Sequence, residues 1–322
     1  MNKPIYQLIC ENIVQGQLDS SFDLPSEDTH GIKWAAGAQD GVYIYHIVHR
    51  PLDDKQFKEL TDAVEAAAKF GYGVAEPMFY NWSKDNQAIT AVDQLLNYVV
   101  DHQKELNPSN LFATAIAMVR DSVHIECVKI GLELLELFDT SGEKVREIIR
   151  NVGLCDEFTI FAIWSMRHWD NGNDEIFELA KKVHGWGRIH AIEFLEPETE
   201  EIKQWLLTEG VHNDVMSAYS ALTCWQKADA EKILFDKPTE EQYRGLSDII
   251  DGLMDEGPCS GISELMNAEE ILVRFLEMSE KYTLTEREYS LFRTIKRWAE
   301  DENEGNSESV VKACKRLLER HH

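Results

Sequence analysis

Short amphipathic segments recur between about residues 91 and 235, and this recurrence most constrains how the chain can fold. Several of them place a large apolar residue, a variable residue, a small residue and another large residue in the same order. They are Ile125–Val128, Thr159–Met166, Arg188–Leu195 and Val215–Leu222. The small residues of successive segments, Cys127, Ala162, Ala191 and Ala218, are 35, 29 and 27 residues apart. Spacing of this kind is typical of proteins built from stacked helix pairs.

A second set of segments fits the other helix of each pair. These segments are Val145–Arg150, Ile176–Lys182 and Ile202–Leu207. A glycine follows each one, at Gly153, Gly185 and Gly210. Because glycine past a helix end adopts the left-handed conformation without a Cβ penalty, we interpret each glycine as a helix stop. The residues expected to cap the helix starts are Asn173, Thr199 and Asn213.

The pattern predicts a mainly α-helical fold, a right-handed α-solenoid of HEAT-like helix pairs over residues 91–238. We expect residues 1–90 to form a small mixed α/β cap, and residues 239–322 to continue the helical array. The helices expected there are Glu240–Met254, Ala268–Tyr282, Thr285–Trp298 and Ser307–Arg320. An ordinary irregular helical bundle is the alternative.

The first 90 residues carry mixed signals. Ile5–Val14 has a helical apolar stripe. Two segments with alternating residues, Ile32–Ala36 and Val42–His46, flank the turn-forming Gly37–Gly41 and predict a β-hairpin. Asp53 with Gln56 fits a capping box at the start of a helix that we expect to stop at Gly71.

Composition excludes several classes of protein. The 322 residues carry a formal charge of −26, from 58 acidic and 32 basic residues. No segment of the sequence carries a continuous stripe of basic residues. Nucleic acid is therefore not an expected partner, whereas a basic protein or peptide surface would be attracted. We find no signal peptide and no apolar run of the roughly 18 residues that a membrane helix needs. We therefore expect a soluble, cytoplasmic protein without a membrane partner.

Six cysteines are scattered singly, with no C-x-x-C pair among them. They are Cys10, Cys127, Cys155, Cys224, Cys259 and Cys314. This usage fits reduced, mostly buried thiols and disfavours a zinc ribbon.

The densest polar and aromatic cluster is His184–His190 with Glu193. Two glycines around Trp186 would let a ligand approach the backbone, Trp186 offers a stacking surface, and Arg188 offers a bidentate donor. His190 and Glu193 are three residues apart and could share a proton or a metal ion. The alternative is a helix turn with Trp186 packed in the interior. The candidate binding residues are Trp169, His184, Trp186, Arg188, His190 and Glu193, with Trp169 expected to be partly exposed.

Common catalytic signatures are absent from the sequence, including the phosphate loop, the dinucleotide fingerprint, H-E-x-x-H and G-x-S-x-G. We therefore expect no cofactor and no metal. The sequence does not decide whether the protein is an enzyme, but it favours a protein that is not one. Among the histidines near the amino terminus, His46 is expected in the core, and His30 and His49 have no assigned role.

The helices with small central residues resemble HEAT-like repeats over about residues 109–235. Over a longer span, Ala36–Gly41 with Tyr45-His46, and His184–His190 with Ala221–Cys224, look like a group of bacterial proteins often labelled limonene hydroxylase. That label implies an oxygenase, whereas the sequence shows no haem-thiolate loop, flavin fingerprint or facial iron triad.

The sequence thus predicts a non-enzymatic cytosolic α-solenoid that acts as a protein-interaction or scaffold module. The alternative is an enzyme of unknown reaction, such as a hydroxylase, with a site where residues 1–90 meet the repeats. That site would use His46 or His190 with a carboxylate.

Overall fold

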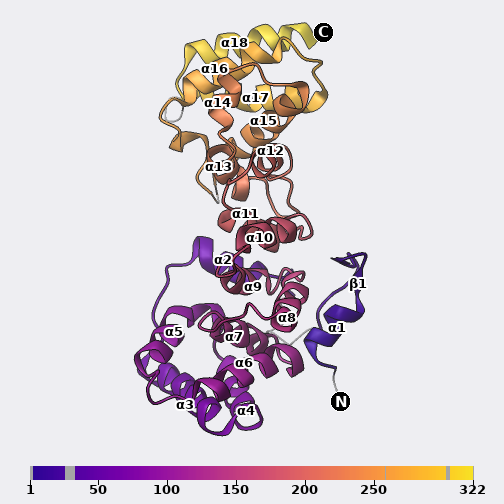
Figure 1. The fold of residues 1–322 in the computed structure, drawn as a ribbon. Coiled ribbons are helices and arrows are strands. Elements are labelled where there is room, and N and C mark those ends of the chain that lie inside the picture. Colours follow the sequence, from indigo (N-terminus) through magenta and orange to yellow (C-terminus); the bar gives the residue numbers. More distant parts are fainter. Residues whose placement is uncertain (1–2, 26–32, 258, 302–304, 322) are drawn as a thin grey trace. The chain divides into compact units, whose positions relative to one another are not determined.

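The computed structural model describes residues 3–25, 33–257, 259–301 and 305–321. Within these ranges the protein is mainly helical, with eighteen α-helices, three short 3₁₀ helices and one two-stranded sheet. The chain divides into two compact units, residues 1–194 and 195–322 (Figure 1). This division lies inside the predicted repeat region. The domain boundaries predicted near residues 90 and 238, at the two ends of that region, stay predictions. None of the helices in the described ranges is long and apolar enough to cross a membrane.

The first unit holds most of the short helices. Its elements are α1 (Ile5–Glu11), β1 (Ile13–Val14), β2 (Gln17–Leu18), α2 (Ala38–His46), α3 (Asp54–Phe70), α4 (Tyr72–Ser83), η1 (Ala88–Thr90), α5 (Val92–Asp101), α6 (Pro108–Asp121), α7 (Ile125–Leu135), α8 (Glu143–Gly153), α9 (Thr159–Met166), α10 (Gly172–Ala180) and α11 (Trp186–Phe194).

The second unit contains the remaining helices, and the four predicted after residue 239 are present. Its elements are α12 (Glu200–Thr208), α13 (Ala218–Lys227), α14 (Ala230–Phe235), α15 (Glu240–Leu253), η2 (Ile262–Glu264), α16 (Ala268–Ser279), α17 (Glu286–Glu300), α18 (Glu308–Leu318) and η3 (Glu319–His321).

The predicted β-hairpin between Ile32 and His46 is wrong over its described part, because Ala38–His46 is the helix α2. Ile32 itself lies outside the described residues. The alternating pattern was weak evidence for a strand, since apolar and aromatic side chains occupy both of its faces. Helical spacing instead puts Gly41 and Tyr45 on one side of α2, where both meet Trp186. The antiparallel hairpin of this unit is much smaller and joins β1 to β2 through Gln15 and Gly16, which both have positive φ.

Local signals for the helix starts were more reliable. Asp53 accepts a hydrogen bond from the Gln56 amide and Gln56 reciprocates, which is the predicted capping box of α3. Gly71 ends α3 with φ of 79°. Thr199 caps α12 as expected, by accepting from the Ile202 amide. Asn173 does not cap α10, because that helix already begins at Gly172.

The predicted glycine stops at Gly153, Gly185 and Gly210 need another explanation. Among the described residues, none of these three has a positive φ, so they are not left-handed caps. They lie instead at close approaches. A Cβ on Gly153 would come 2.9 Å from the Cβ of Ala162, and one on Gly210 would come 2.5 Å from the Cys224 sulfur. Absence of a side chain, rather than backbone freedom, therefore explains these glycines.

The four small residues of the predicted repeat are buried, at Cys127, Ala162, Ala191 and Ala218. Within the first unit, α9 packs on both α7 and α11, and α8 packs on α9 as α10 packs on α11. Within the second, α12 packs on α13 and both contact α15. Helix α7 lies deepest, because every residue from Cys127 to Leu135 is buried.

Candidate functional site

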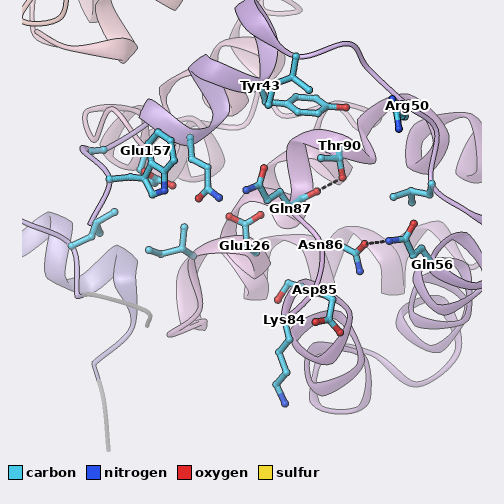
Figure 2. A pocket seen from close by; sticks show the side chains of 18 of the residues that line it. Tyr43, Arg50, Gln56, Lys84, Asp85, Asn86, Gln87, Thr90, Glu126 and Glu157 are labelled. Atoms are coloured by element: carbon cyan, nitrogen blue, oxygen red, sulfur yellow. Dashed lines mark hydrogen bonds between the residues drawn. The ribbon is translucent and has the colours of Figure 1, made fainter. Parts of the chain in front are cut away.

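The first unit contains a cleft of about 1090 Å³ that α2, α4, η1 and α7 help to line. Figure 2 shows it with Glu157 and Arg50 at opposite ends and Glu126 beneath Tyr43. None of the six candidate residues from the sequence lines this cleft. The structure therefore offers a different candidate site from the sequence.

The walls of the cleft are rich in amide and hydroxyl side chains. Two of these are fixed by their own hydrogen bonds: the Gln56 amide donates to Asn86 at 2.7 Å, and the Thr90 hydroxyl donates to the Gln87 carbonyl at 2.7 Å (Figure 2). Both partners line the cleft as well. Side chains held in this way are oriented before a ligand binds, which reduces the entropy lost on binding.

An exposed apolar edge adjoins these polar walls. Trp34, Ile47 and Val48 line the cleft and are 42%, 49% and 82% exposed. Three large apolar side chains that share one cleft are more informative than scattered exposed residues, which are normal on protein surfaces. The cleft thus combines an apolar edge with oriented hydrogen-bonding groups.

A buried cluster of charged residues underlies one end of the cleft. The Lys129 ammonium on α7 lies 2.7 Å from Asp40 of α2, 3.0 Å from Glu126 and 2.6 Å from Glu157. The side chains of Lys129 and Asp40 are 1% and 2% exposed. Glu126 and Glu157 remain 17% and 15% exposed and line the cleft. One buried cation therefore joins two cleft residues to a buried carboxylate.

The two cleft carboxylates also hold the backbone around them. Glu126 accepts a hydrogen bond of 2.6 Å from the Ala88 amide at the start of η1. Glu157 accepts one of 2.7 Å from the Gly37 amide, just before α2. Gly37 has φ of 73°, and a Cβ there would also meet the Asp156 carbonyl at 2.6 Å. These contacts fix the start of η1 relative to α7 and the start of α2 relative to the segment before α9, and they hold both carboxylates in place.

A fourth carboxylate, Glu133, shares the cluster's face of α7. It follows Lys129 by four residues and Glu126 by seven, which places all three on one side of the helix. Glu133 is completely buried, and neither of its oxygens accepts a hydrogen bond from the described residues. Burial, with Glu126 and Asp40 nearby, raises the pKa of Glu133 well above its usual value.

The two buried members of the ion pair, Asp40 and Lys129, also have shifted pKa values. Burial raises the pKa of Asp40 to about 7, although Lys129 opposes the shift. Burial also acts to lower the pKa of Lys129, but Asp40, Glu126 and Glu157 outweigh it and hold that pKa well above the usual value. Lys129 is thus a structural cation, and the raised pKa brings Asp40 to a change of charge near neutral pH.

The residues of the predicted 184–193 cluster are divided between the interior and the surface. Trp186 and Arg188 are 5% and 7% exposed, so both side chains are buried. His190 is buried beside Tyr45 and Trp186, and burial lowers its pKa to about 4. His184 and Glu193 are exposed. The aromatic group packs in the interior because Gly41 of α2 makes room for the Trp186 indole.

Trp169 is also buried, at 6% exposure, which contradicts the expected partial exposure. Its indole N–H donates to the Thr140 hydroxyl at 2.8 Å, and the Arg146 guanidinium lies 4.4 Å from its ring centre. Polar neighbours in sequence suggested a surface position. The satisfied N–H and the cation over the ring show how an amphipathic indole is buried instead.

The histidines near the amino terminus are separated in the structure. His46 lines the cleft and is not a core residue, contrary to the expectation. His49 stacks on Tyr43 with ring centres 4.6 Å apart. His30 lies outside the described residues. Among the residues that the structure describes, no group of three or more His, Cys, Asp or Glu side chains could hold a metal ion.

Sequence reasoning did not find the Lys129 cluster, although one signal pointed to it. Lys129 and Glu133 interrupt the otherwise apolar run Cys127–Leu135. A helix that is apolar all round is buried, so charged residues within it must be paired inside the protein. The partners Asp40 and Glu157 could not be identified in this way, because they are distant in sequence.

No protein-family model matches this chain, and the comparisons with curated proteins and with solved structures find no match either.

Proposed function

We propose that this protein is a cytoplasmic binding module, built from HEAT-like helix pairs, whose first unit binds a short peptide segment of a partner protein in the cleft. The observation that carries the proposal is the cleft itself, which joins the exposed Trp34, Ile47 and Val48 to walls of oriented amides. Apolar anchors supply most of the binding energy at such surfaces, while amides hydrogen-bond the main chain of an extended peptide.

The packing of the helices supports the proposed repeat architecture. A helix whose small central residue is buried, and which packs on the helices before and after it, is what a stack of pairs requires. Helix α9 meets this description with Ala162, α7 on one side and α11 on the other. The handedness of the stack and its extension over residues 91–238 belong to the proposal.

Selection from a random peptide library displayed on phage tests this function. The unaltered protein should enrich peptides that contain apolar residues. The double variant Ile47→Ser, Val48→Ser should bind the selected peptides at least about tenfold more weakly, because two apolar anchors of the cleft are lost. Hydrogen exchange of the complex should show protection in α2 and η1.

A matched control is Phe70→Ser, which removes another exposed apolar side chain that does not line the cleft. It should leave peptide binding unchanged. A library that yields no peptide, or peptides that bind the double variant as tightly as the unaltered protein, would refute the proposal. Chemical alteration of a bound peptide by the protein would favour the enzyme alternative, in which His46 acts at the cleft.

A further inference from the structure

We infer that Glu126 and Glu157 form a subsite that binds the guanidinium of an arginine in the partner peptide, at the end of the cleft opposite Arg50. The inference rests on the proposed peptide-binding function and specifies which peptides bind. It follows from the charge balance of the Lys129 cluster, from an unsatisfied buried carboxylate, and from the position of the two cleft carboxylates.

The charge balance of the cluster is negative. Three carboxyl groups, those of Asp40, Glu126 and Glu157, lie 2.6–3.0 Å from the single ammonium of Lys129, and that of Glu133 interacts with it electrostatically. Protonation of Glu133, which its raised pKa favours, still leaves three carboxyl groups for one cation. In a poorly hydrated site this excess is costly, so a second cation placed against it would be stabilised more strongly than on an open surface.

Glu133 provides an independent sign that the cluster is electrostatically incomplete. It is fully buried, lies on the same face of α7 as Glu126 and Lys129, and accepts no hydrogen bond from the described part of the chain. Native proteins rarely bury a carboxyl group without a partner. Burial is the largest cause of the raised pKa of Glu133, and the negative charges of Glu126 and Asp40 raise it further. The same negative charge would attract a cation to Glu126.

The two cleft carboxylates have the capacity to accept more hydrogen bonds. In Glu126, one oxygen lies 3.0 Å from Lys129 and the other accepts from the Ala88 amide. In Glu157, one oxygen lies 2.6 Å from Lys129 and the other accepts from the Gly37 amide. Each carboxylate has about four lone-pair positions, so further donors can be accommodated. The planar guanidinium, with five N–H donors, suits two fixed carboxylates.

The basic residues already lining the cleft are directed elsewhere. Lys33 pairs with Asp23 at 2.8 Å, and the Lys84 ammonium donates to Asn81 at 2.9 Å and lies over the Tyr80 ring. Arg50 lies far from Glu157 along the cleft (Figure 2). These residues therefore do not neutralise the end of the cleft formed by Glu126 and Glu157. The apolar side chains of Ile47 and Trp34 would contact apolar peptide residues that flank the arginine.

Binding at this subsite should be linked to a proton. A guanidinium beside Glu126 and Glu157 would favour the charged form of Asp40, whose other titratable neighbours are Lys129 and Glu133. Because the pKa of Asp40 is about 7 in the free protein, the bound cation would lower it and release a proton near neutral pH. Affinity for an arginine peptide should consequently rise as the pH increases from 6 to 8.

Isothermal titration calorimetry with three capped pentapeptides tests the inference. The peptides share apolar flanking residues and carry arginine, citrulline or glutamate at the centre. Citrulline has the shape of arginine without the charge. The arginine peptide should bind about tenfold to a hundredfold more tightly than the citrulline peptide, and the glutamate peptide more weakly still. Titrations in two buffers of different ionisation enthalpy should show proton release for the arginine peptide.

Protein variants locate the effect. Glu126→Gln and Glu157→Gln keep an oxygen for the Ala88 and Gly37 amides but remove the charge, and each should reduce the preference for arginine over citrulline. Asp40→Asn should abolish the proton release. The control Glu59→Gln, a surface carboxylate outside the cleft, should preserve both effects. Thermal melts identify any variant that fails to fold. If a variant does not fold, the comparison of the three peptides on the unaltered protein decides whether the inference holds.

The outcomes separate the subsite from the proposed function. Equal affinity for the arginine and citrulline peptides, with binding sensitive to the loss of Ile47 and Val48, would refute the arginine subsite and leave the peptide-binding function standing. Absence of binding by all three peptides, together with an unproductive library selection, would refute both. An arginine preference that survives both glutamine substitutions would place the cationic site elsewhere.

Discussion

The Lys129 ammonium lies 2.7 Å from the Asp40 carboxylate, and both side chains are almost completely buried. This pair connects α7 to α2 through two residues that are 89 positions apart in the sequence. Removing one member of a buried ion pair typically costs about 3–5 kcal/mol, because the other charge is left without a partner.

Lys129→Met should therefore destabilise the first unit by about 3–5 kcal/mol at pH 7.5. Urea unfolding measures this loss. The loss should be smaller at pH 5.5, where the neighbouring carboxyl groups protonate more readily once the cation is gone. Lys55→Met is the matched control, since Lys55 pairs with Glu59 at 3.7 Å on the surface and should contribute little. Equal effects of the two substitutions would contradict the structural role of Lys129.

The stability of the first unit should fall as the pH rises from about 4 to 7. Asp40 has a folded-state pKa of about 7, above its ordinary value of 3.8, so the folded protein binds a proton that the unfolded chain has lost in this range. Burial shifts Glu133 in the same direction. Because the folded state then holds more protons, increasing pH favours unfolding.

The measurement for this pH dependence is urea unfolding at pH 5.5 and pH 8, compared with the Asp40→Asn variant. Asparagine resembles the protonated acid, so the variant should lose part of the dependence. If the slope of stability against pH is identical in both proteins, then Asp40 does not titrate in this window.

Gly41→Ala should destabilise the protein by about 1–3 kcal/mol, because the new Cβ would enter the space of the Trp186 indole. A rigid ring within the core cannot move aside cheaply. The matched control is Gly73→Ala in α4, where a Cβ meets nothing within 4 Å and alanine has the higher helix propensity. Thermal melts should show a lower Tm for the first variant and an equal or higher Tm for the second.

Ala191→Leu should cost about 1–3 kcal/mol through overpacking, since Ala191 is fully buried at the small position of α11. Ala113→Leu in α6 is the control, because Ala113 is exposed. Differential scanning calorimetry of the two variants tests the prediction. A tolerated leucine at 191 would show that this residue does not lie at a close helix contact.

The sequence alone determined the helical character of the chain, most helix positions and several helix ends. These depend on local rules: an apolar stripe of helical period, a capping box at Asp53 and Gln56, and a left-handed glycine at Gly71. Each involves residues within one or two turns of each other. A reader of the sequence can therefore evaluate them without knowing what lies across the fold.

Only the tertiary structure decided which side chains meet over long separations. Asp40 lies in a helix because Gly41 accommodates Trp186, more than a hundred residues away, whereas its local pattern also fitted a strand. Trp169 and Arg188 are buried by neighbours that their local sequence does not reveal. The cleft and its charged cluster depend on the same kind of contact, because Asp40, Lys129 and Glu157 converge only when three separate segments pack together.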